Sequence, residues 1–402
     1  MWIAAAALLF FQTAGPSADG LKALEDGRYD AAAQSFAKAI EADPSDYSAH
    51  FNLALAYSFL QKDNEGIAEY RKALELKPGL YQAQLNAGIL LLRQKRPAEA
   101  LPLLESAAGQ KPSEYRPQFY LAEAQLGTGA AVKAEASYRA ALAIDAKAPG
   151  AQLGLARALS QQGKLADAAP YFRQAAQSPQ YRDALLELAG LYEKNGQAAE
   201  AIEIYRQFPE NPGAAERLGA LLLDTKQYRD AIPSLEQAYA KAPSAAGRVA
   251  LAMAYTFDGQ SEKALPLLEK AVGDDPANFD LRIMYAHTLR DRKQYPAAAR
   301  QFSEALKLKP NDGHTWDELG GVLYLAEDYQ NALAAFDRAH QLGENIAGNW
   351  FLRAIILDKF HQLKPAIQAY QQFLSMSHEQ NPDQEFQARQ RVRILQRELE
   401  RK

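Results

Sequence analysis

The sequence YSAHFNLALAYSFLQKDNEGIAEYRKALELKP occupies residues 47–78 and carries two series of apolar residues. Within each series the residues recur three or four positions apart: Phe51, Leu55 and Phe59, then Ile67, Tyr70 and Leu74. This spacing puts each series on one face of a helix. The polar stretch QKDNEG separates the two series, and Pro78 ends the second, because proline lacks an amide hydrogen and its ring clashes with the preceding turn. The stretch therefore predicts a helix, a short turn and a second helix.

The same pattern returns along the chain with a nearly constant period. Pro44, Pro78 and Pro112 are 34 residues apart, and a similar spacing returns at Pro243, Pro276 and Pro310. A fixed period of this length is typical of stacked helical units. Small residues recur with the same period, at places where two helix backbones must approach closely. They are Ala54, Gly66 and Ala73; Gly88, Ala100 and Ala107; Gly219, Ala231 and Ala238; Ala252, Ala264 and Ala271; and Gly320, Ala332 and Ala339.

Residues 316–339 read WDELGGVLYLAEDYQNALAAFDRA and resemble the tetratricopeptide repeat (TPR). The pattern of that family is a Trp, a Leu-Gly, a Tyr, and then Ala, Phe, Ala and Pro at fixed places. The resemblance covers about residues 19–378, although Ala146, Gln180, Glu344 and His378 stand at the place of the last proline. It implies an all-α fold, a right-handed α-solenoid (superhelix) of about eleven TPR-like helix-turn-helix repeats with a C-terminal capping helix.

Four segments are predicted: a candidate signal peptide at 1–18, an N-terminal TPR array at 19–211, a C-terminal TPR array at 212–378 and a capping helix at 379–402. In the sequence FPENPG, Pro209 and Pro212 cut short the second helix of the sixth unit. We therefore expect a bend or slackened stacking near residues 207–214, which would divide the array into two rigid halves.

The capping helix is predicted from an apolar stripe with 4-3-4 spacing, formed by Ala388, Val392, Leu395 and Leu399. A solenoid needs a last element that covers the exposed end of its core and is polar on the outside. The solvated outer face is expected to carry five arginines: Arg389, Arg391, Arg393, Arg397 and Arg401.

The N-terminus contains an apolar run, IAAAALLFF at residues 3–11, followed by the small residues Ala14, Gly15, Ser17 and Ala18. This order is similar to the apolar core and cleavage region of a secretory signal, although no basic residue precedes the run. The run is too short for a stable transmembrane span, which needs about 20 residues. We expect an exported protein, periplasmic or secreted. The alternative is a cytoplasmic protein whose first apolar helix packs on the end of the array.

Composition excludes several classes of chemistry. The chain of 402 residues has no cysteine, so it forms no disulfide, thiolate zinc site or lipid-modified cysteine. Its 45 basic and 49 acidic residues give a net charge of -4, which provides no electrostatic footprint for nucleic acid. The catalytic patterns GxxxxGK[ST], GxSxG and HExxH are absent. Gly127-Thr128-Gly129 lies at a predicted helix-to-helix turn and lacks the third glycine of a dinucleotide loop.

We expect no enzyme activity, no cofactor and no metal site. His287 and His314 would project from neighbouring leading helices, near Asp280 and Asp317. A metal site needs three or four ligands at fixed geometry, so solvated groove residues are the better interpretation of this pair.

The resemblance implies a concave surface lined by the leading helix of each repeat, where side chains at the second, fifth, sixth, ninth and twelfth places contact a protein or peptide partner. The predicted groove residues are Phe51, Asn52, Leu55, Leu85, Asn86, Ile89, Phe119, Tyr120, Glu123, Arg157, His287, Arg290, His314 and Asp317. The N-terminal members suit apolar anchors of an amphipathic helix or extended peptide, and the C-terminal members are polar.

Two alternatives apply to the N-terminal part of this set. The first is that four large apolar residues, Phe51, Leu85, Phe119 and Leu153, mainly cover neighbouring helices. The second concerns Asn52 and Asn86, which stand 34 residues apart and could each hydrogen-bond a peptide amide, similar to the asparagine ladder of other TPR arrays. A clamp for acidic chaperone tails is not predicted, because only Asn86 and Arg116 match its pattern.

The leading functional hypothesis is a non-catalytic TPR scaffold or adaptor, serving a bacterial-type envelope complex. The first alternative is an exported TPR protein linked to polysaccharide binding or export, since tyrosines can stack on sugars. Most tyrosines, however, fall on repeat-core places such as Tyr57, Tyr70, Tyr192 and Tyr205. An enzyme is the third hypothesis, and no nucleophile, base and orienting group occur together to support it.

Overall fold

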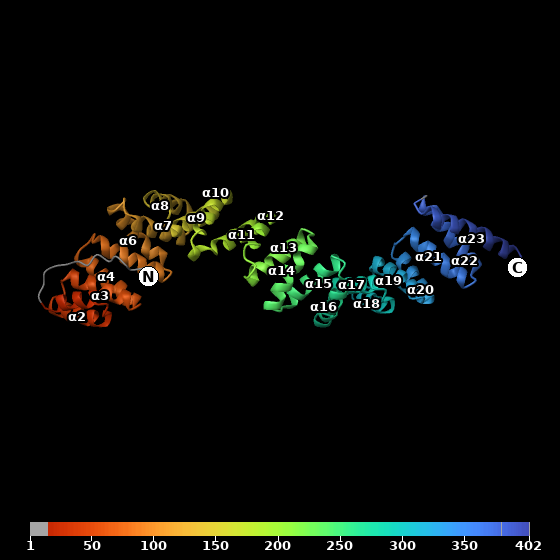
Figure 1. Cartoon of the computed structure of the whole chain (residues 1–402), viewed down its shortest axis with the longest axis horizontal. Coiled ribbons are helices and arrows are strands. Elements are labelled where there is room, and N and C mark those ends of the chain that lie inside the picture. Colours follow the sequence, from red (N-terminus) through yellow and green to blue (C-terminus); the bar gives the residue numbers. More distant parts are fainter. Residues whose placement is uncertain (1–14, 379, 402) are drawn as a thin grey trace. The chain divides into compact units, whose positions relative to one another are not determined.

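The structure, a computed structural model, describes residues 15–378 and 380–401. These residues contain 23 α-helices and no strand. In chain order, helices α1 to α22 make eleven consecutive helix-turn-helix units, and α23 follows them (Figure 1). The predictions of an all-α fold and of about eleven helix-turn-helix units are confirmed. Most of the predicted signal segment, residues 1–14, lies outside the described residues.

The first helices of the pairs are α1 (Pro16–Glu25), α3 (Tyr47–Phe59), α5 (Tyr81–Arg93), α7 (Tyr115–Gly127), α9 (Pro149–Gln161), α11 (Ala184–Lys194), α13 (Pro212–Asp224), α15 (Ala245–Phe257), α17 (Phe279–Asp291), α19 (Gly313–Leu325) and α21 (Ala347–Lys359). The second helices are α2 (Tyr29–Ala42), α4 (Asp63–Leu76), α6 (Pro97–Gln110), α8 (Ala131–Ile144), α10 (Leu165–Ala175), α12 (Ala198–Tyr205), α14 (Tyr228–Lys241), α16 (Ser261–Asp274), α18 (Tyr295–Leu308), α20 (Tyr329–Gln341) and α22 (Leu363–Ser377). A 3-10 turn, η1 (Pro179–Tyr181), precedes α11, and the last helix is α23 (Pro382–Glu400).

One turn geometry joins the two helices of every pair. A residue with positive φ follows the first helix, and in each pair the next amide donates to the carbonyl five residues earlier, at 2.7 to 3.0 Å. This bond satisfies a carbonyl that the helix end would otherwise leave unpaired. Glycine holds the left-handed place in five pairs and a larger residue in six: Gly27, Gln61, Lys95, Gly129, Gly163, Gly196, Lys226, Gly259, Lys293, Glu327 and His361. Gly129, the last residue of the sequence Gly127-Thr128-Gly129, is therefore a turn residue.

Small residues let the two helices of a pair approach closely, as predicted. A Cβ atom at Gly88 would lie 2.5 Å from the side chain of Leu104, and one at Gly320 would lie 2.6 Å from the ring of Phe336. The largest fully buried side chains include Tyr70, which belongs to the same buried cluster as Ala54 and Ala73 of its own pair.

The described residues fall into two compact units, one ending at Gln197 and the other beginning at Ala198. In the second unit, α12 has only eight residues, which confirms the prediction that the second helix of the sixth repeat is cut short. Pro212 is the first residue of the next helix, α13. The predicted division between residues 211 and 212, the bend near 207–214 and the superhelical winding of the whole array stay predictions. None of the helices within residues 15–378 and 380–401 has the length and apolar character needed to cross a bilayer.

Helix α23 covers the end of the second unit with its apolar stripe. Ala388 and Leu395 are fully buried in a cluster with Phe351 and Phe373 of the last pair. Arg391 corrects one sequence expectation, because its guanidinium does not lie on a purely solvated outer face. Its Nε and Nη2 donate to the carboxylate of Asp358 on α21, each at 2.7 Å.

Candidate functional site

The first unit buries several side chains that were predicted to line a groove. Phe51 and Leu55 are 0% and 1% exposed, and Leu85 is 4% exposed. Phe119 and Leu153 are also buried. Neighbouring first helices contact each other, α1 with α3 and α5 with α7, and large side chains between them are enclosed. These residues belong to the core, as the alternative interpretation held, and we remove them from the candidate binding surface.

The two asparagines of the predicted ladder differ in their surroundings. Asn52 is 2% exposed, and its Oδ1 atom accepts no hydrogen bond. Asn86 is half-buried and donates from Nδ2 to the hydroxyl of Tyr70 at 3.2 Å. Ile89 is half-buried beside it. A peptide backbone cannot reach the amide of Asn52 in this conformation, so the pair does not form a two-step ladder.

Polar side chains on α7, α9 and α11 form interactions within the first unit. The Tyr138 hydroxyl donates to the Glu123 carboxylate, and burial raises the pKa of Glu123 in spite of that bond. Arg157 forms a two-bond pair with Glu187, with Nη2 2.8 Å from Oε2. Tyr120 is half-buried, with its ring 5.2 Å from that of Phe119. Glu123, Arg157 and Tyr120 therefore each contact another side chain of the first unit.

In the second unit, three predicted residues converge on a carboxylate that the sequence prediction missed. Nε2 of His287 lies 2.7 Å from Glu318, Nη1 of Arg290 lies 3.4 Å away and Nε2 of His314 lies 3.9 Å away. Burial opposes ionisation of Glu318, but the hydrogen bond and charge of His287, with the charges of His314 and Arg290, hold its pKa below the ordinary value. Glu318 could have been found from the sequence, because it holds the sixth place of its leading helix.

Asp317 is the fourth predicted residue of this region, and its pKa is raised whereas that of the neighbouring Glu318 is lowered. Burial and the nearby charge of Glu344 raise the pKa of Asp317 to about 6. Among the residues that the structure describes, no group of three or more histidine, aspartate or glutamate side chains is arranged to hold a metal ion.

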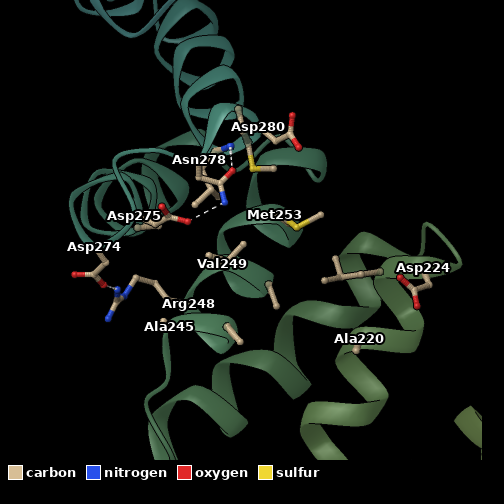
Figure 2. Close-up of a pocket in the computed structure, with 16 residues that line it drawn as sticks. Ala220, Asp224, Ala245, Arg248, Val249, Met253, Asp274, Asp275, Asn278 and Asp280 are labelled. Atoms are coloured by element: carbon tan, nitrogen blue, oxygen red, sulfur yellow. Dashed lines mark hydrogen bonds and ion pairs between the residues drawn. The ribbon is translucent and has the colours of Figure 1, made fainter. Parts of the chain in front are cut away.

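The second unit also contains an open pocket of about 710 Å³ lined by residues of α13, α15 and α17, with Ala271 and Asp274 from the end of α16. Its apolar lining is formed by Leu223, Val249, Met253, Leu281 and Met284, with the small residues Ala220, Ala245, Ala246, Ala250 and Ala271 between them. Polar residues complete it: Asp224, Arg248, Asp274, Asp275, Asn278 and Asp280. We call this the α13–α17 pocket (Figure 2). Its volume lies within the range of ligand pockets, about 300–1,000 Å³.

The hollow follows from side-chain size at the repeat's inner places. The fifth, sixth and ninth places of α15 hold Val249, Ala250 and Met253, whereas the fifth and ninth places of α3 hold the larger, buried Phe51 and the buried Leu55. Of the pocket residues, the sequence indicated Asp280 near the inner surface and Ala271 only as a close-packing residue, because alanine and methionine at helical spacing look like ordinary core. The signal that could have found the others is the run of small residues at inner places of consecutive repeats.

Two family models, both described as tetratricopeptide repeat, match most of the chain. One matches residues 18–81, 64–115, 85–149 and 216–279, and the other matches 159–222 and 258–319.

Among curated relatives, the general transcriptional corepressor ssn6 of Schizosaccharomyces pombe is 29% identical over 126 residues, covering 31% of this chain and 11% of the relative. Cellulose synthase 2 operon protein C of Komagataeibacter xylinus is 27% identical over 269 residues, covering 64% of this chain and 20% of the relative. The human protein O-mannosyl-transferase TMTC1 is 25% identical over 201 residues, covering 40% of this chain and 23% of the relative. The chain therefore matches less than a quarter of the length of each of these relatives.

A solved structure of MamA from Desulfovibrio magneticus RS-1 is 20% identical, with a TM-score of 0.38, and covers 41% of this chain and 93% of that one. The family matches agree with the eleven helix pairs, their small-residue contacts and their shared turn. The chain belongs to the tetratricopeptide repeat family.

Proposed function

We propose that the chain is a non-catalytic scaffold that binds a segment of a protein partner in the α13–α17 pocket. Its family supports a role as a protein-interaction scaffold. The observation that carries the choice of surface is the open pocket of about 710 Å³, lined by inner places of three successive first helices.

The pocket suits a peptide better than the inner face of the first unit does. Inner-place side chains that do not fill the core between repeats are available to contact a partner, unlike the buried Phe51 and Leu55 of the first unit. Here the half-buried Val249, Met253 and Met284 present apolar surface without filling the space between helices. Apolar anchors seated in such a hollow supply most of the binding energy in helix-in-groove and extended-peptide recognition.

A blocking substitution tests this proposal. Ala250→Trp would place an indole in the pocket, and Lys270→Trp on the exposed surface of α16 is the matched control. Purified full-length chains are used to capture proteins from native membrane and envelope extracts, with quantitative mass spectrometry. We expect wild type and Lys270→Trp to capture the same partner. Ala250→Trp should lose this partner although its thermal stability is unchanged. Equal capture by all three chains would contradict the proposal.

We also propose that the scaffold is exported and works in a bacterial envelope complex. The apolar run at residues 3–11 supports export, and the similarity to a cellulose synthase operon protein is compatible with such a location. Sequencing the N-terminus of the mature protein in separated cell fractions tests this. Met1 retained on a cytoplasmic protein would contradict it.

Polysaccharide binding is the second candidate function, and an aromatic cluster in the first unit favours it. Tyr115, Tyr120 and Tyr181 are half-buried, and Tyr115 stacks on Phe119 with ring centroids 5.6 Å apart. Partly exposed tyrosine rings combine an apolar face with a polar tip, which suits a sugar ring. Binding on a glycan array that is lost in Tyr120→Ala would support this role, and an array without specific binding would oppose it.

A further inference from the structure

We propose that the segment seated in the α13–α17 pocket is a basic amphipathic peptide, with aliphatic side chains on the pocket floor and lysine or arginine side chains at its rim. This inference rests on the proposed function of the pocket and adds the chemical class of the partner. Two features carry it: the composition of the floor and the unpaired charge around it.

The floor accepts aliphatic side chains of more than one shape. Met253 and Met284 are flexible thioethers that can repack around an inserted side chain, and Leu223 and Val249 add fixed apolar walls. Ala250 leaves room between them. Figure 2 labels Met253 on α15, Asp280 on α17 and Asp224 on α13, all of which line the pocket.

The rim carries an excess of negative charge. Four aspartates and one arginine line the pocket. The arginine, Arg248, is already engaged: it forms an ion pair with Asp274 and donates from Nε to the Tyr239 hydroxyl at 3.3 Å, and its side chain is only 10% exposed. No cation of the lining is left for a ligand.

The remaining three aspartates have no cationic partner in the described part of the chain. Asp275 accepts a hydrogen bond from Nδ2 of Asn278 at 3.1 Å, which is a neutral donor. Asp224 and Asp280 are exposed, and neither forms an ion pair or side-chain hydrogen bond within residues 15–378 and 380–401. Arg217, on the same helix as Asp224, has an interaction of its own.

Charge complementarity therefore selects the partner. An acidic segment or a free C-terminal carboxylate would meet three carboxylates and no available cation, and juxtaposed like charges disfavour binding. Lysine or arginine at the edge of an apolar segment would pair with Asp224, Asp275 and Asp280 while its alkyl stem covers the apolar floor.

Three fluorescein-labelled peptides test the partner class by fluorescence anisotropy with the full-length chain. The basic aliphatic probe is LKKLLKKLLKKL, and its controls are LEELLEELLEEL, which reverses the charge, and AKKAAKKAAKKA, which removes the aliphatic anchors. We expect the basic aliphatic probe to bind at least tenfold more tightly than either control. Its affinity should fall when NaCl is raised from 50 to 300 mM, because rim charges are screened by salt.

Charge-neutralising variants assign the effect to the rim. Each exposed pair is expected to change affinity by roughly two- to fivefold, so D224N/D280N should weaken binding of the basic aliphatic probe by about four- to twenty-fivefold. The matched control, E65Q/D167N, removes two exposed acidic charges in the first unit and should leave binding unchanged. Circular dichroism melting curves check that both double variants fold like wild type.

The outcomes separate this inference from the proposed function. Equal binding of the acidic and basic aliphatic probes, or equal affinity of wild type and D224N/D280N, would overturn the basic-peptide inference while partner capture through Ala250 could still stand. Unchanged partner capture and unchanged probe binding in Ala250→Trp would overturn both. Wild-type oligomers in sedimentation velocity that dissociate in D224N/D280N would assign the pocket to a second copy of the chain and overturn the inference of a separate partner.

Discussion

Gly320 and Gly321 are adjacent in α19 and allow a direct test of the close contact between paired helices. A Cβ atom at Gly320 would lie 2.6 Å from two ring carbons of Phe336 and 3.0 Å from a third, whereas one at Gly321 would have no heavy atom within 4 Å. Phe336 is 3% exposed, so its ring has little space into which to move. Replacing each glycine by alanine therefore adds the same methyl group to a crowded place and to an open one.

The size of the effect follows from two opposing contributions. Alanine in a helix interior is favoured over glycine by about 1 kcal/mol, and this gain applies to both variants. Gly320→Ala must also separate α19 from α20 or turn the Phe336 ring, and such overpacking costs about 1–3 kcal/mol. We expect Gly321→Ala to stabilise the chain by about 0.5–1 kcal/mol and Gly320→Ala to leave it unchanged or destabilise it by up to about 2 kcal/mol.

Urea unfolding followed by circular dichroism measures the free energy of unfolding of both variants. Because long repeat arrays can depart from two-state unfolding, hydrogen exchange of the α19 and α20 amides gives a local value as well. The propensity gain cancels in the difference between the variants, which leaves the contact with Phe336. Equal shifts of the two variants, or a larger stabilisation by Gly320→Ala, would refute the assignment of this glycine to close packing.

Three further predictions concern the cap, the acidic side chain of α19 and the turns. Arg391→Ala should reduce hydrogen-exchange protection of α23 by about 1–3 kcal/mol, because it removes a two-bond ion pair with the largely buried Asp358; unchanged protection would show that the apolar stripe alone holds the cap. The pKa of Asp317 is raised from 3.8 to about 6, so the native state holds this proton more tightly and the contribution of Asp317 to stability falls as pH rises between these values. Melting curves should therefore show an advantage of Asp317→Asn that grows from pH 4.5 to 7.5, and a constant advantage would contradict the raised pKa. Lys95→Gly removes the strain of a non-glycine residue at a φ of 59°. It should raise the free energy of unfolding of the first unit by up to about 1 kcal/mol in urea unfolding, and a destabilised variant would show that the lysine side chain has another role.

The fold was predictable in detail because each contact in a repeat array is local. Residues 47–78 already indicate a helix, a turn and a helix, and small residues such as Ala54 and Ala73 recur where the structure places close helix contacts. The left-handed turn residues were less visible. Glycine marks five of the eleven turns, as at Gly163, but Gln61 and Lys95 hold the same conformation without a sequence signal, since the next amide's hydrogen bond compensates for their strain.

The candidate site was only partly predictable. The convergence of His287, Arg290 and His314 agrees with their predicted inner places, although their shared partner Glu318 was missed. The apolar groove predicted at Phe51 and Leu55 was wrong, since both side chains are enclosed by the core.

The sequence by itself determined the repeat family, the number of helix pairs and the apolar stripe of the cap, because hydrophobic period and small-residue spacing act between neighbours in the chain. Only the tertiary structure decided which inner places are filled and which are hollow. The same place in the repeat is enclosed core at Phe51 and open pocket wall at Val249. The difference depends on the combined volume of side chains from three neighbouring helices, and no single repeat contains that information.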